Sequence, residues 1–311
     1  MKAVVLKGAG SVDNLVLTEL PVPEPAETEV LVKIKAISIN PVDVKTRAGK
    51  GRYNILKEEN PLILGWDISG VVVASNSPLF KENDEVFGMV NFPGHGRAYA
   101  EYVAAPAAHL ALKPANISHE EAAAATLAAL TAWQALVDHA SIKPGHRVLI
   151  HAAAGGVGHY AVQLAKNLGA YVIGTSSAAN RDVILGLGAD EHIDYHTQPL
   201  VQHVSDVDFV LDTIGGDVID QSLEVMKPGA TIISIPSGLR EAVTVKAEAK
   251  GINGFFILVA SNGAEMGSIA VLLEQGRLRS IVSKTFPLEE IQQAHLQVET
   301  GRTVGKVIVR V

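Results

Sequence analysis

Hydrophobic and polar positions follow two different patterns along this chain of 311 residues. Up to about residue 116 the hydrophobic runs are short and are separated by Pro and Gly. Residues 29–35, for example, alternate between hydrophobic and polar side chains. An alternation with a period of two is typical of half-buried strands. The first part of the chain is therefore predicted to be a β-rich domain.

From about residue 117 the pattern changes to alternating helices and strands. Ser118 and Glu121 have the spacing of a capping box, and they precede an Ala-rich helix that is predicted to reach about residue 139. Strands are predicted at 148–151, 171–175, 209–212, 231–235 and 254–260. Such an order predicts an α/β fold with a doubly wound parallel sheet over residues 117–264. After a helix at 266–275, the final strand at 306–311 is expected to return to the first domain, which thus comprises residues 1–116 and 265–311.

A small-residue loop between the first two of these strands carries the clearest chemical signal. The loop follows an apolar run and precedes an amphipathic segment, as in a dinucleotide-binding βαβ unit. Its backbone N–H groups and the following helix N-terminus are predicted to hold a pyrophosphate through Ala154, Gly155, Gly156, Val157 and Gly158. Ala153 stands where the usual fingerprint has its first glycine. The alternative is a tight strand-to-helix turn that binds nothing.

The end of the second strand indicates which dinucleotide would bind. Residues 174–181 contain no acidic side chain that could accept hydrogen bonds from a ribose 2′-OH. They offer instead the hydroxyls of Ser176 and Ser177 and the cation of Arg181, which suit a 2′-phosphate. The predicted cofactor is NADP(H). Alternatively, Ser177 caps a helix and Arg181 is an ordinary surface residue.

Composition limits the class of protein. Apolar residues make up 48% of the chain, the net charge is −7, and there is no cysteine. Cysteine-based catalysis and cysteine-ligated metals are excluded. Without basic clusters, nucleic acid and anionic membranes are not expected as main partners. No apolar run reaches the roughly 20 residues of a membrane span. The first residues lack the pattern of a signal peptide, so a cytoplasmic protein is expected.

Several motifs, in order along nearly the whole chain, resemble one family. They lie at residues 38–43, 64–70, 128–133, 151–158, 211–215 and 286–295. Together they are similar to the zinc-independent branch of the medium-chain dehydrogenase/reductase superfamily, the quinone oxidoreductases or zeta-crystallin-like proteins. The resemblance implies a GroES-like β-rich domain beside a Rossmann domain, with the active site between them. It also implies homodimers joined through the edges of their Rossmann sheets.

The resemblance also suggests residues of the site. Asn40 and Asp43 match a segment near the nicotinamide and substrate, and Tyr53 resembles a substrate-lining tyrosine that donates to a carbonyl oxygen. Thr131 matches a threonine near the nicotinamide amide. Each has a purely structural alternative: a turn at Asn40, a loop aromatic at Tyr53, and a helix residue bonding to its preceding turn at Thr131. Thr213 and Gly215 follow a strand at the predicted carboxyl edge of the sheet, where ligands of such sheets bind. Trp66 and His151 are equally or better explained by packing.

A catalytic metal is not expected. Where zinc-containing members of the superfamily have ligands, this chain has Ser38 and the pair Trp66 and Asp67. His192 and His196 have helical ligand spacing, but they lie near a predicted strand and loop, where their rings need not share a face.

The predicted function is a zinc-independent oxidoreductase that transfers a hydride from NADPH to a quinone or an α,β-unsaturated carbonyl, both small-molecule substrates. Such substrates delocalise the developing charge and need no Lewis acid. Two alternatives stay open. One is a metal-free alcohol or enoyl-thioester reductase on the same scaffold, and the other is a crystallin-like protein that binds NADPH with little turnover.

Overall fold

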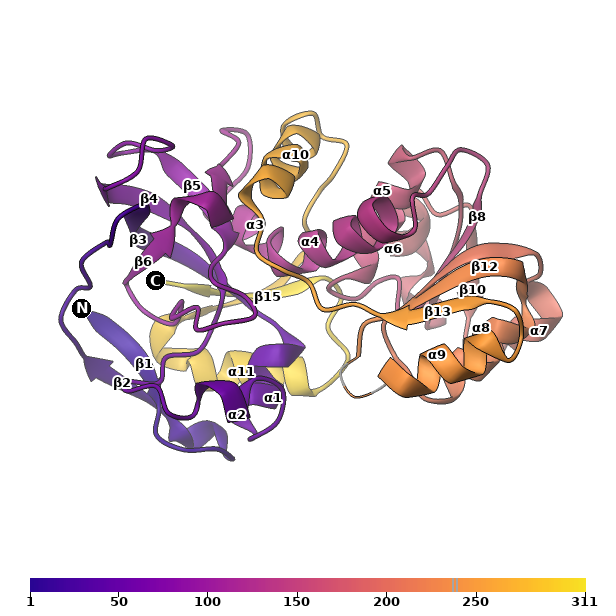
Figure 1. Cartoon of the computed structure of the whole chain (residues 1–311), viewed down its shortest axis with the longest axis horizontal. Coiled ribbons are helices and arrows are strands. Elements are labelled where there is room, and N and C mark those ends of the chain that lie inside the picture. Colours follow the sequence, from indigo (N-terminus) through magenta and orange to yellow (C-terminus); the bar gives the residue numbers. More distant parts are fainter. Residues whose placement is uncertain (237, 239) are drawn as a thin grey trace. The chain divides into compact units, whose positions relative to one another are not determined.

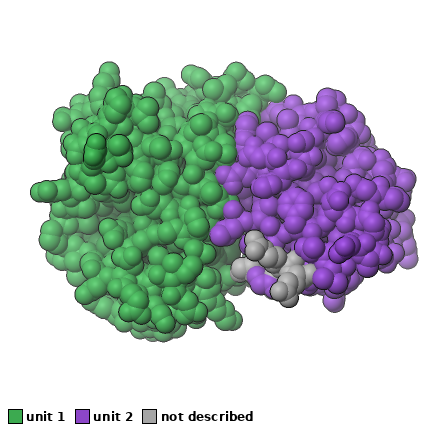
Figure 2. Space-filling view, viewed as in Figure 1, with its two compact units in different colours: residues 1–130, 259–311 green, residues 131–258 purple. Residues whose placement is uncertain are grey.

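The computed structural model describes residues 1–236, 238 and 240–311. The chain forms two compact units, coloured separately in Figure 2. Unit 1 comprises Met1–Leu130 and Val259–Val311, and unit 2 comprises Thr131–Leu258. Residues 117–130 lie in unit 1 because helix α3 (His119–Ala124) packs against strands of that unit, whereas the change of sequence pattern placed them at the start of the second domain.

Unit 1 is built on a large, mainly antiparallel sheet (Figure 1). Its strands follow the order β14-β15-β3-β4-β5-β7, with β6 also paired to β3, and β1 and β2 form a separate hairpin. β15 pairs antiparallel with β3, which confirms that the last strand returns to the first domain. The strands are β1 (Lys2–Leu6), β2 (Leu15–Glu19), β3 (Glu29–Ile39), β4 (Asp67–Ser75), β5 (Glu85–Met89), β6 (Tyr102–Pro106), β7 (Leu110–Leu112), β14 (Val282–Pro287) and β15 (Lys306–Arg310).

Short helices surround this sheet, and the start of α3 confirms the predicted capping box. The backbone N–H of Glu121 donates to Ser118 Oγ at 3.2 Å, and the N–H of Ser118 donates to Glu121 Oε2 at 2.8 Å. The other helices of unit 1 are α1 (Pro41–Arg47), α2 (Tyr53–Leu56), α10 (Gly263–Glu274) and α11 (Ile291–Glu299), and α4 (Leu127–Trp133) crosses into unit 2.

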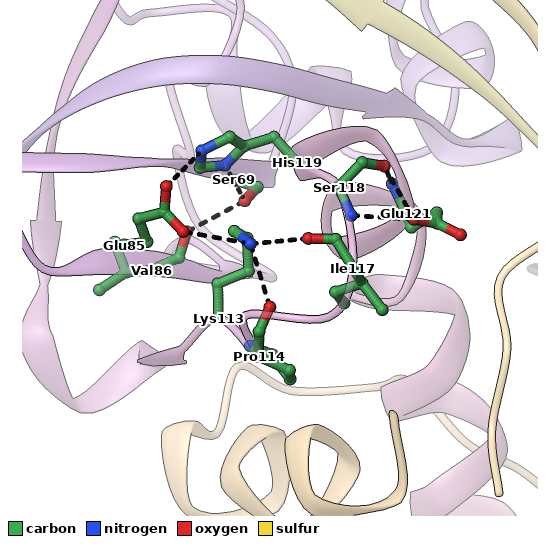
Figure 3. A network of polar contacts seen from close by, with 9 residues as sticks. All are labelled: Ser69, Glu85, Val86, Lys113, Pro114, Ile117, Ser118, His119 and Glu121. Carbon is green, nitrogen blue, oxygen red and sulfur yellow. Dashed lines mark hydrogen bonds and ion pairs between the residues drawn. The ribbon is translucent and has the colours of Figure 1, made fainter. Parts of the chain in front are cut away.

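A polar network fastens α3 to the sheet (Figure 3). His119 Nδ1 lies 2.8 Å from Ser69 Oγ, and His119 Nε2 lies 3.4 Å from Glu85 Oε1. The order serine, histidine, carboxylate is that of a hydrolase triad, but Ser69 is fully buried. Its hydroxyl also lies 3.2 Å from the carbonyl oxygen of Val86, and a side chain this deep inside unit 1 cannot reach a substrate. The network is therefore structural.

Unit 2 confirms the doubly wound parallel sheet. Six strands follow the order β10-β9-β8-β11-β12-β13, and every neighbouring pair is parallel. The connection order reverses between β8 and β11, which is where open α/β sheets bind ligands. The strands are β8 (Arg147–Ile150), β9 (Tyr171–Ser176), β10 (Glu191–Asp194), β11 (Val207–Asp212), β12 (Met226–Ser234) and β13 (Asn253–Phe256).

Helices cover both faces of this sheet, α5 and α6 on one side and α8 and α9 on the other (Figure 1). Leu149, Val210 and Ile232 from the central strands form a core with residues of α8 and α9. A π-helical turn, Gln134–His139, precedes β8. The helices are α5 (Gly158–Asn167), α6 (Arg181–Gly186), α7 (Leu200–His203), α8 (Asp217–Glu224) and α9 (Arg240–Glu248). Within the described residues, no helix is both long and apolar enough to cross a lipid bilayer.

Candidate functional site

The glycine loop lies at the switch point of the unit 2 sheet. It leaves the end of β8 and enters α5 at Gly158, and Gly155, Gly156 and Val157 are half-buried. Val157 is the N-cap of α5 and gives the helix no side-chain hydrogen bond. A helix start without a side-chain cap, at the carboxyl edge of a parallel sheet, fits a pyrophosphate. Ala154, by contrast, is buried beneath the loop, with 4% of its surface exposed.

Close packing explains both the alanine and the last glycine of the loop. Ala153 is fully buried, and its N–H donates to Thr175 O at 2.9 Å. A Cβ at Gly174 would lie only 2.9 Å from Ala153 Cβ, so the missing side chain at 174 accommodates the extra methyl group at 153. A Cβ at Gly158 would overlap the carbonyl oxygen of Ala152. Gly158 is therefore required by the fold of the loop itself.

His151, which directly follows β8, connects this strand to β9 and α8 through its side chain. Its ring lies 3.1 Å from Thr175 Oγ1 through Nδ1 and 2.8 Å from Ser222 Oγ through Nε2. Burial lowers the pKa of His151 to about 4, so the ring is neutral at physiological pH. This position fits a packed strand-end histidine, the alternative preferred from the sequence.

The end of β11 forms the second wall of the switch point. Asp212 is fully buried, and its Oδ1 accepts the N–H groups of Ile214 at 2.9 Å and Gly215 at 2.8 Å. Thr213 Oγ1 donates to the carbonyl oxygen of His151 at 2.9 Å, which ties this turn to β8. Gly215 has a φ of 83°, in the left-handed region that favours glycine. The structure thus brings Thr213 and Gly215 beside the strand that bears the glycine loop.

The predicted 2′-phosphate residues lie together after β9. Ser176 is buried and Ser177 half-buried, and Arg181 begins α6 with 61% of its side chain exposed. Ser177 gives no side-chain cap to the 3₁₀ turn that follows it (Ala178–Asn180), although its Oγ accepts from Asn180 Nδ2 at 3.4 Å. Arg181 Nη1 lies 3.5 Å from the exposed carboxylate of Asp182, a contact that water screens.

Asn40 and Asp43 lie in a buried polar cluster of unit 1. Asn40 precedes α1, and its backbone N–H donates to Asp43 Oδ2 at 2.6 Å. Its side-chain Nδ2 donates to Asp67 Oδ2 at 2.7 Å, and its Oδ1 accepts from Lys306 Nζ. The four side chains are between 0% and 3% exposed. Both predicted residues are therefore held in fixed positions by this cluster.

Charge balance assigns a proton within this cluster. Burial, followed by repulsion from Asp67, raises the pKa of Asp43 to about 8. Asp67 Oδ1 accepts from the N–H of Leu127 at 3.1 Å and its Oδ2 from Asn40, while Asp43 Oδ1 has no partner among the described residues. The carboxylate with more hydrogen-bond donors, that of Asp67, keeps its charge beside Lys306, and Asp43 carries the proton at neutral pH.

Tyr99 and His295 extend the cluster, and sequence reasoning missed both. Tyr99 Oη lies 2.9 Å from His295 Nε2, and burial lowers the pKa of His295 to about 3. Burial, followed by the nearby carboxyl group of Asp43, raises the pKa of Tyr99. Tyr99 and His295 come from segments far from Asp43 in the chain, so no local motif could show that these three side chains lie together.

Three other residues considered in the sequence analysis, Tyr53, Thr131 and Trp66, lie outside these clusters. Tyr53 begins α2 and is half-buried, and Thr131 is buried at 4% exposure. Trp66 is fully buried, donates through Nε1 to Gly94 O at 2.7 Å and packs edge-on against Phe92 with ring centroids 5.1 Å apart. Trp66 is therefore a core residue of unit 1.

No metal site is evident in the part of the chain that the structure describes: nowhere do three or more His, Cys, Asp or Glu side chains lie together as a ligand group. The side chain of His192 in β10 contacts Ser176, whereas His196 lies beyond the strand and is exposed.

Comparison with protein families gives two matches. Residues 26–115 match the alcohol dehydrogenase GroES-like domain, and residues 187–309 match the zinc-binding dehydrogenase family.

Individual proteins are similar over the whole chain. The chain is 34% identical to 2-methylene-furan-3-one reductase of Solanum lycopersicum and 34% identical to the chloroplastic NADPH-dependent alkenal/one oxidoreductase of Arabidopsis thaliana. Each alignment covers 99% of this chain and 79% of the relative. Among solved structures, the quinone oxidoreductase from Coxiella burnetii superimposes with a TM-score of 0.94 at 38% identity, covering 100% of this chain and 99% of that one.

Proposed function

The chain belongs to the medium-chain dehydrogenase/reductase superfamily, and from this premise we propose that it catalyses NADPH-dependent reduction of quinones or α,β-unsaturated carbonyl compounds. One observation carries the proposal. The side-chain-uncapped start of α5 lies at the switch point of the sheet, and the neighbouring strand β9 ends in Ser176 and Ser177 without a carboxylate. This arrangement suits a dinucleotide with a phosphate on its 2′ position.

The proposed cofactor contacts divide among three strand ends. The backbone at Gly155, Gly156 and Val157 would hold the pyrophosphate, supported by the dipole of α5. Ser176, Ser177 and Arg181 would hold the 2′-phosphate. Thr213 and Gly215 line the strand beside the loop, and Thr131 would meet the nicotinamide amide, as its resemblance to the family suggests.

Similarity to three reductases supports the substrate class. Their names describe a methylene-furanone reductase, an alkenal/one oxidoreductase and a quinone oxidoreductase. Each of these substrates has a carbonyl conjugated to an electron-poor double bond, which spreads negative charge without a metal ion. A chain that lacks cysteine and has Ser38 in place of a zinc ligand fits such chemistry.

Bound NADPH supplies a hydride, and the residues of this chain would bind and orient the acceptor and provide a proton. Tyr53, half-buried in unit 1, would donate a hydrogen bond to the carbonyl oxygen. Asn40 keeps a fixed orientation because Asp67 and Lys306 occupy its amide. Asp43 would hold a proton at neutral pH on its unpartnered Oδ1. Fixing reactants in place supplies much of the rate enhancement of such reactions.

The homodimer implied by the family resemblance belongs to the same proposal. β13 is an edge strand of the unit 2 sheet, so its outer edge has no strand partner within the described chain. An edge of this kind suits pairing with a second copy.

A substrate panel tests the proposed function. Purified protein is incubated with NADPH or NADH and with quinones, alkenals, enones and enoyl-thioesters, and NADPH consumption and products are followed with and without a strong chelator. We expect NADPH-dependent reduction of quinones or enones that survives the chelator, with no stoichiometric zinc in the protein. Preference for enoyl-thioesters would favour the thioester reductase, and tight NADPH binding without turnover on any substrate would favour the binding protein. One bound zinc per chain, together with loss of activity when the chelator removes it, would refute the proposal that the enzyme works without a metal.

A further inference from the structure

His192 faces the group of residues proposed to hold the 2′-phosphate. It lies on β10, and its Nε2 is 2.9 Å from Ser176 Oγ on β9. The Ser176 hydroxyl also lies 2.9 Å from the carbonyl oxygen of Ser177, which can accept a hydrogen bond from it when a protonated Nε2 of His192 donates to the serine. The imidazole thereby fixes the direction of one of the two hydroxyls in the proposed phosphate pocket.

The register of the sheet puts this histidine on the same side as Arg181. His192 pairs with Gly174, and Asp194 pairs with Ser176, so these side chains share one face. A Cβ at Gly174 would meet Ile184 of α6, which identifies that face as the one covered by α6. Arg181 is the first residue of α6.

Burial and two charged side chains, Arg181 and Asp194, affect the pKa of His192. Burial lowers the pKa of His192, the cation of Arg181 lowers it further, and the carboxylate of Asp194 on its own strand opposes them. Asp194 is itself held by Thr197 and His196, and Arg181 by the exposed Asp182. Arg181 is therefore close enough to His192 to affect its pKa, and both side chains would lie near a phosphate held by Ser176 and Ser177. A dianion there would favour the charged form of both.

We propose that His192 is a specificity-determining residue that takes up a proton when a 2′-phosphate binds, so that NADPH binding, but not NADH binding, is coupled to protonation of this side chain. The inference rests on the proposed function, because it assumes that Ser176, Ser177 and Arg181 hold the phosphate. Neutral His192 would orient the Ser176 hydroxyl, and protonated His192 would add a charge-assisted hydrogen bond. Discrimination between the two dinucleotides would thus increase as the pH falls.

Titration calorimetry of the full chain tests this coupling. NADPH and NADH are each titrated at about pH 6, 7 and 8 in buffers with different ionisation enthalpies, which reports proton uptake directly. In the wild type we expect uptake of a fraction of a proton with NADPH and none with NADH. A charge-assisted hydrogen bond is strong enough to make the histidine-dependent part of NADPH affinity roughly tenfold greater at low pH than at high pH.

Two variants and a control isolate the side chain. His192→Gln keeps a donor near Ser176 but cannot titrate, so its extra affinity at low pH and its proton uptake should disappear. His192→Val removes the donor as well and should weaken NADPH further at high pH, with NADH unchanged. His196→Gln removes a neighbouring exposed histidine and should behave as the wild type. Titration of the phosphate itself is common to all four proteins and cancels in the comparison.

The outcomes separate this inference from the proposed function. Equal proton uptake in wild type and His192→Gln, or equal losses of NADPH and NADH affinity in both variants, would overturn the role of His192 while leaving the cofactor choice intact. A wild type that binds NADH more tightly than NADPH would refute the cofactor choice and the inference together.

Discussion

At the scale of single residues, the buried pair of carboxyl groups in unit 1 shows how position determines charge. Asp43 and Asp67 share one ammonium group, that of Lys306, which lies 3.9 Å from Asp67 Oδ2. Two carboxylates and one cation would leave a buried net negative charge, which is costly. A proton on Asp43 makes the cluster neutral, and its single backbone donor is consistent with that form.

This assignment predicts how stability depends on pH. Folding raises the pKa of Asp43 from 3.8 to about 8, so the folded chain binds more protons than the unfolded chain between these values. Stability must therefore fall as the pH rises through this window, here by a few kcal/mol from this group. Asp43→Asn imitates the protonated carboxyl and should remove that part of the decline. Denaturant unfolding between about pH 5 and 9 measures it, and an unchanged slope in the variant would place the proton elsewhere.

Arg181 gives a second prediction at this scale. A charge-assisted hydrogen bond contributes roughly 1.5–3 kcal/mol, but the side chain is 61% exposed, so the lower end applies. Arg181→Ala should weaken NADPH by about tenfold and leave NADH nearly unchanged, because only NADPH carries the phosphate. The measurement is the affinity of the wild type and the variant for NADPH and for NADH. Arg302→Ala, which removes another exposed arginine, is the control. Equal losses for both cofactors would indicate a structural role for Arg181.

At the scale of elements, two glycines of the same loop are expected to have different roles: Gly155 serves dinucleotide binding, and Gly158 serves both binding and the fold of the loop. A Cβ at Gly155 would lie 3.1 Å from the carbonyl oxygen of Ala152, a tight but tolerable contact, whereas a Cβ at Gly158 would overlap that oxygen. Gly155→Ala should therefore weaken dinucleotide binding with little loss of stability. Gly158→Ala should weaken binding and also lower the free energy of unfolding by about 1–3 kcal/mol.

A glycine in open space provides the matched control for these variants. Nothing lies within 4 Å of a Cβ at Gly267, inside α10, so Gly267→Ala should stabilise the protein by about 0.5–1 kcal/mol without affecting binding. Thermal unfolding and NADPH titration of the three variants make the comparison. A Gly158→Ala protein as stable as the wild type would show that the loop adapts to a side chain.

Elements that carry their own local signal could be predicted from the sequence. The β8 strand, the glycine loop and the capping box at Ser118 each lie within a few residues of chain, and the structure confirms them. The sequence placed His192 near a strand but gave β10 no bounds, because Ile193 is its only buried residue. The cluster of Asn40, Asp67 and Lys306 was missed for a different reason. Its contacts join residues far apart in sequence, and a lysine in a strand ordinarily faces water.

At the scale of the whole molecule, unit 1 is completed by both ends of the chain. β15 inserts between β14 and β3, so the last strand lies inside the sheet that the first hundred residues begin. Lys306 opens β15 and is 3% exposed, and its Nζ also donates to the carbonyl oxygen of Ile39 at 3.3 Å. A single buried side chain thus ties the C-terminal segment to β3, α1 and β4. Unit 2 has a complete six-stranded sheet without it.

This arrangement predicts that Lys306→Met weakens one unit selectively. Removal of the ammonium leaves the carboxylate of Asp67 buried without its cation, a change that typically costs about 3–5 kcal/mol. Amide hydrogen exchange should become faster in β3, β4 and β15, while β8, β9 and β11 in unit 2 keep their protection. Lys284→Met, which removes an exposed lysine of the neighbouring strand β14, should change neither set. Adding Asp67→Asn to Lys306→Met should restore part of the lost protection, because no unpaired charge then remains buried. Uniformly faster exchange in both units would instead mean that they unfold as one cooperative body, and no rescue by Asp67→Asn would mean that Lys306 acts through packing and not through its charge.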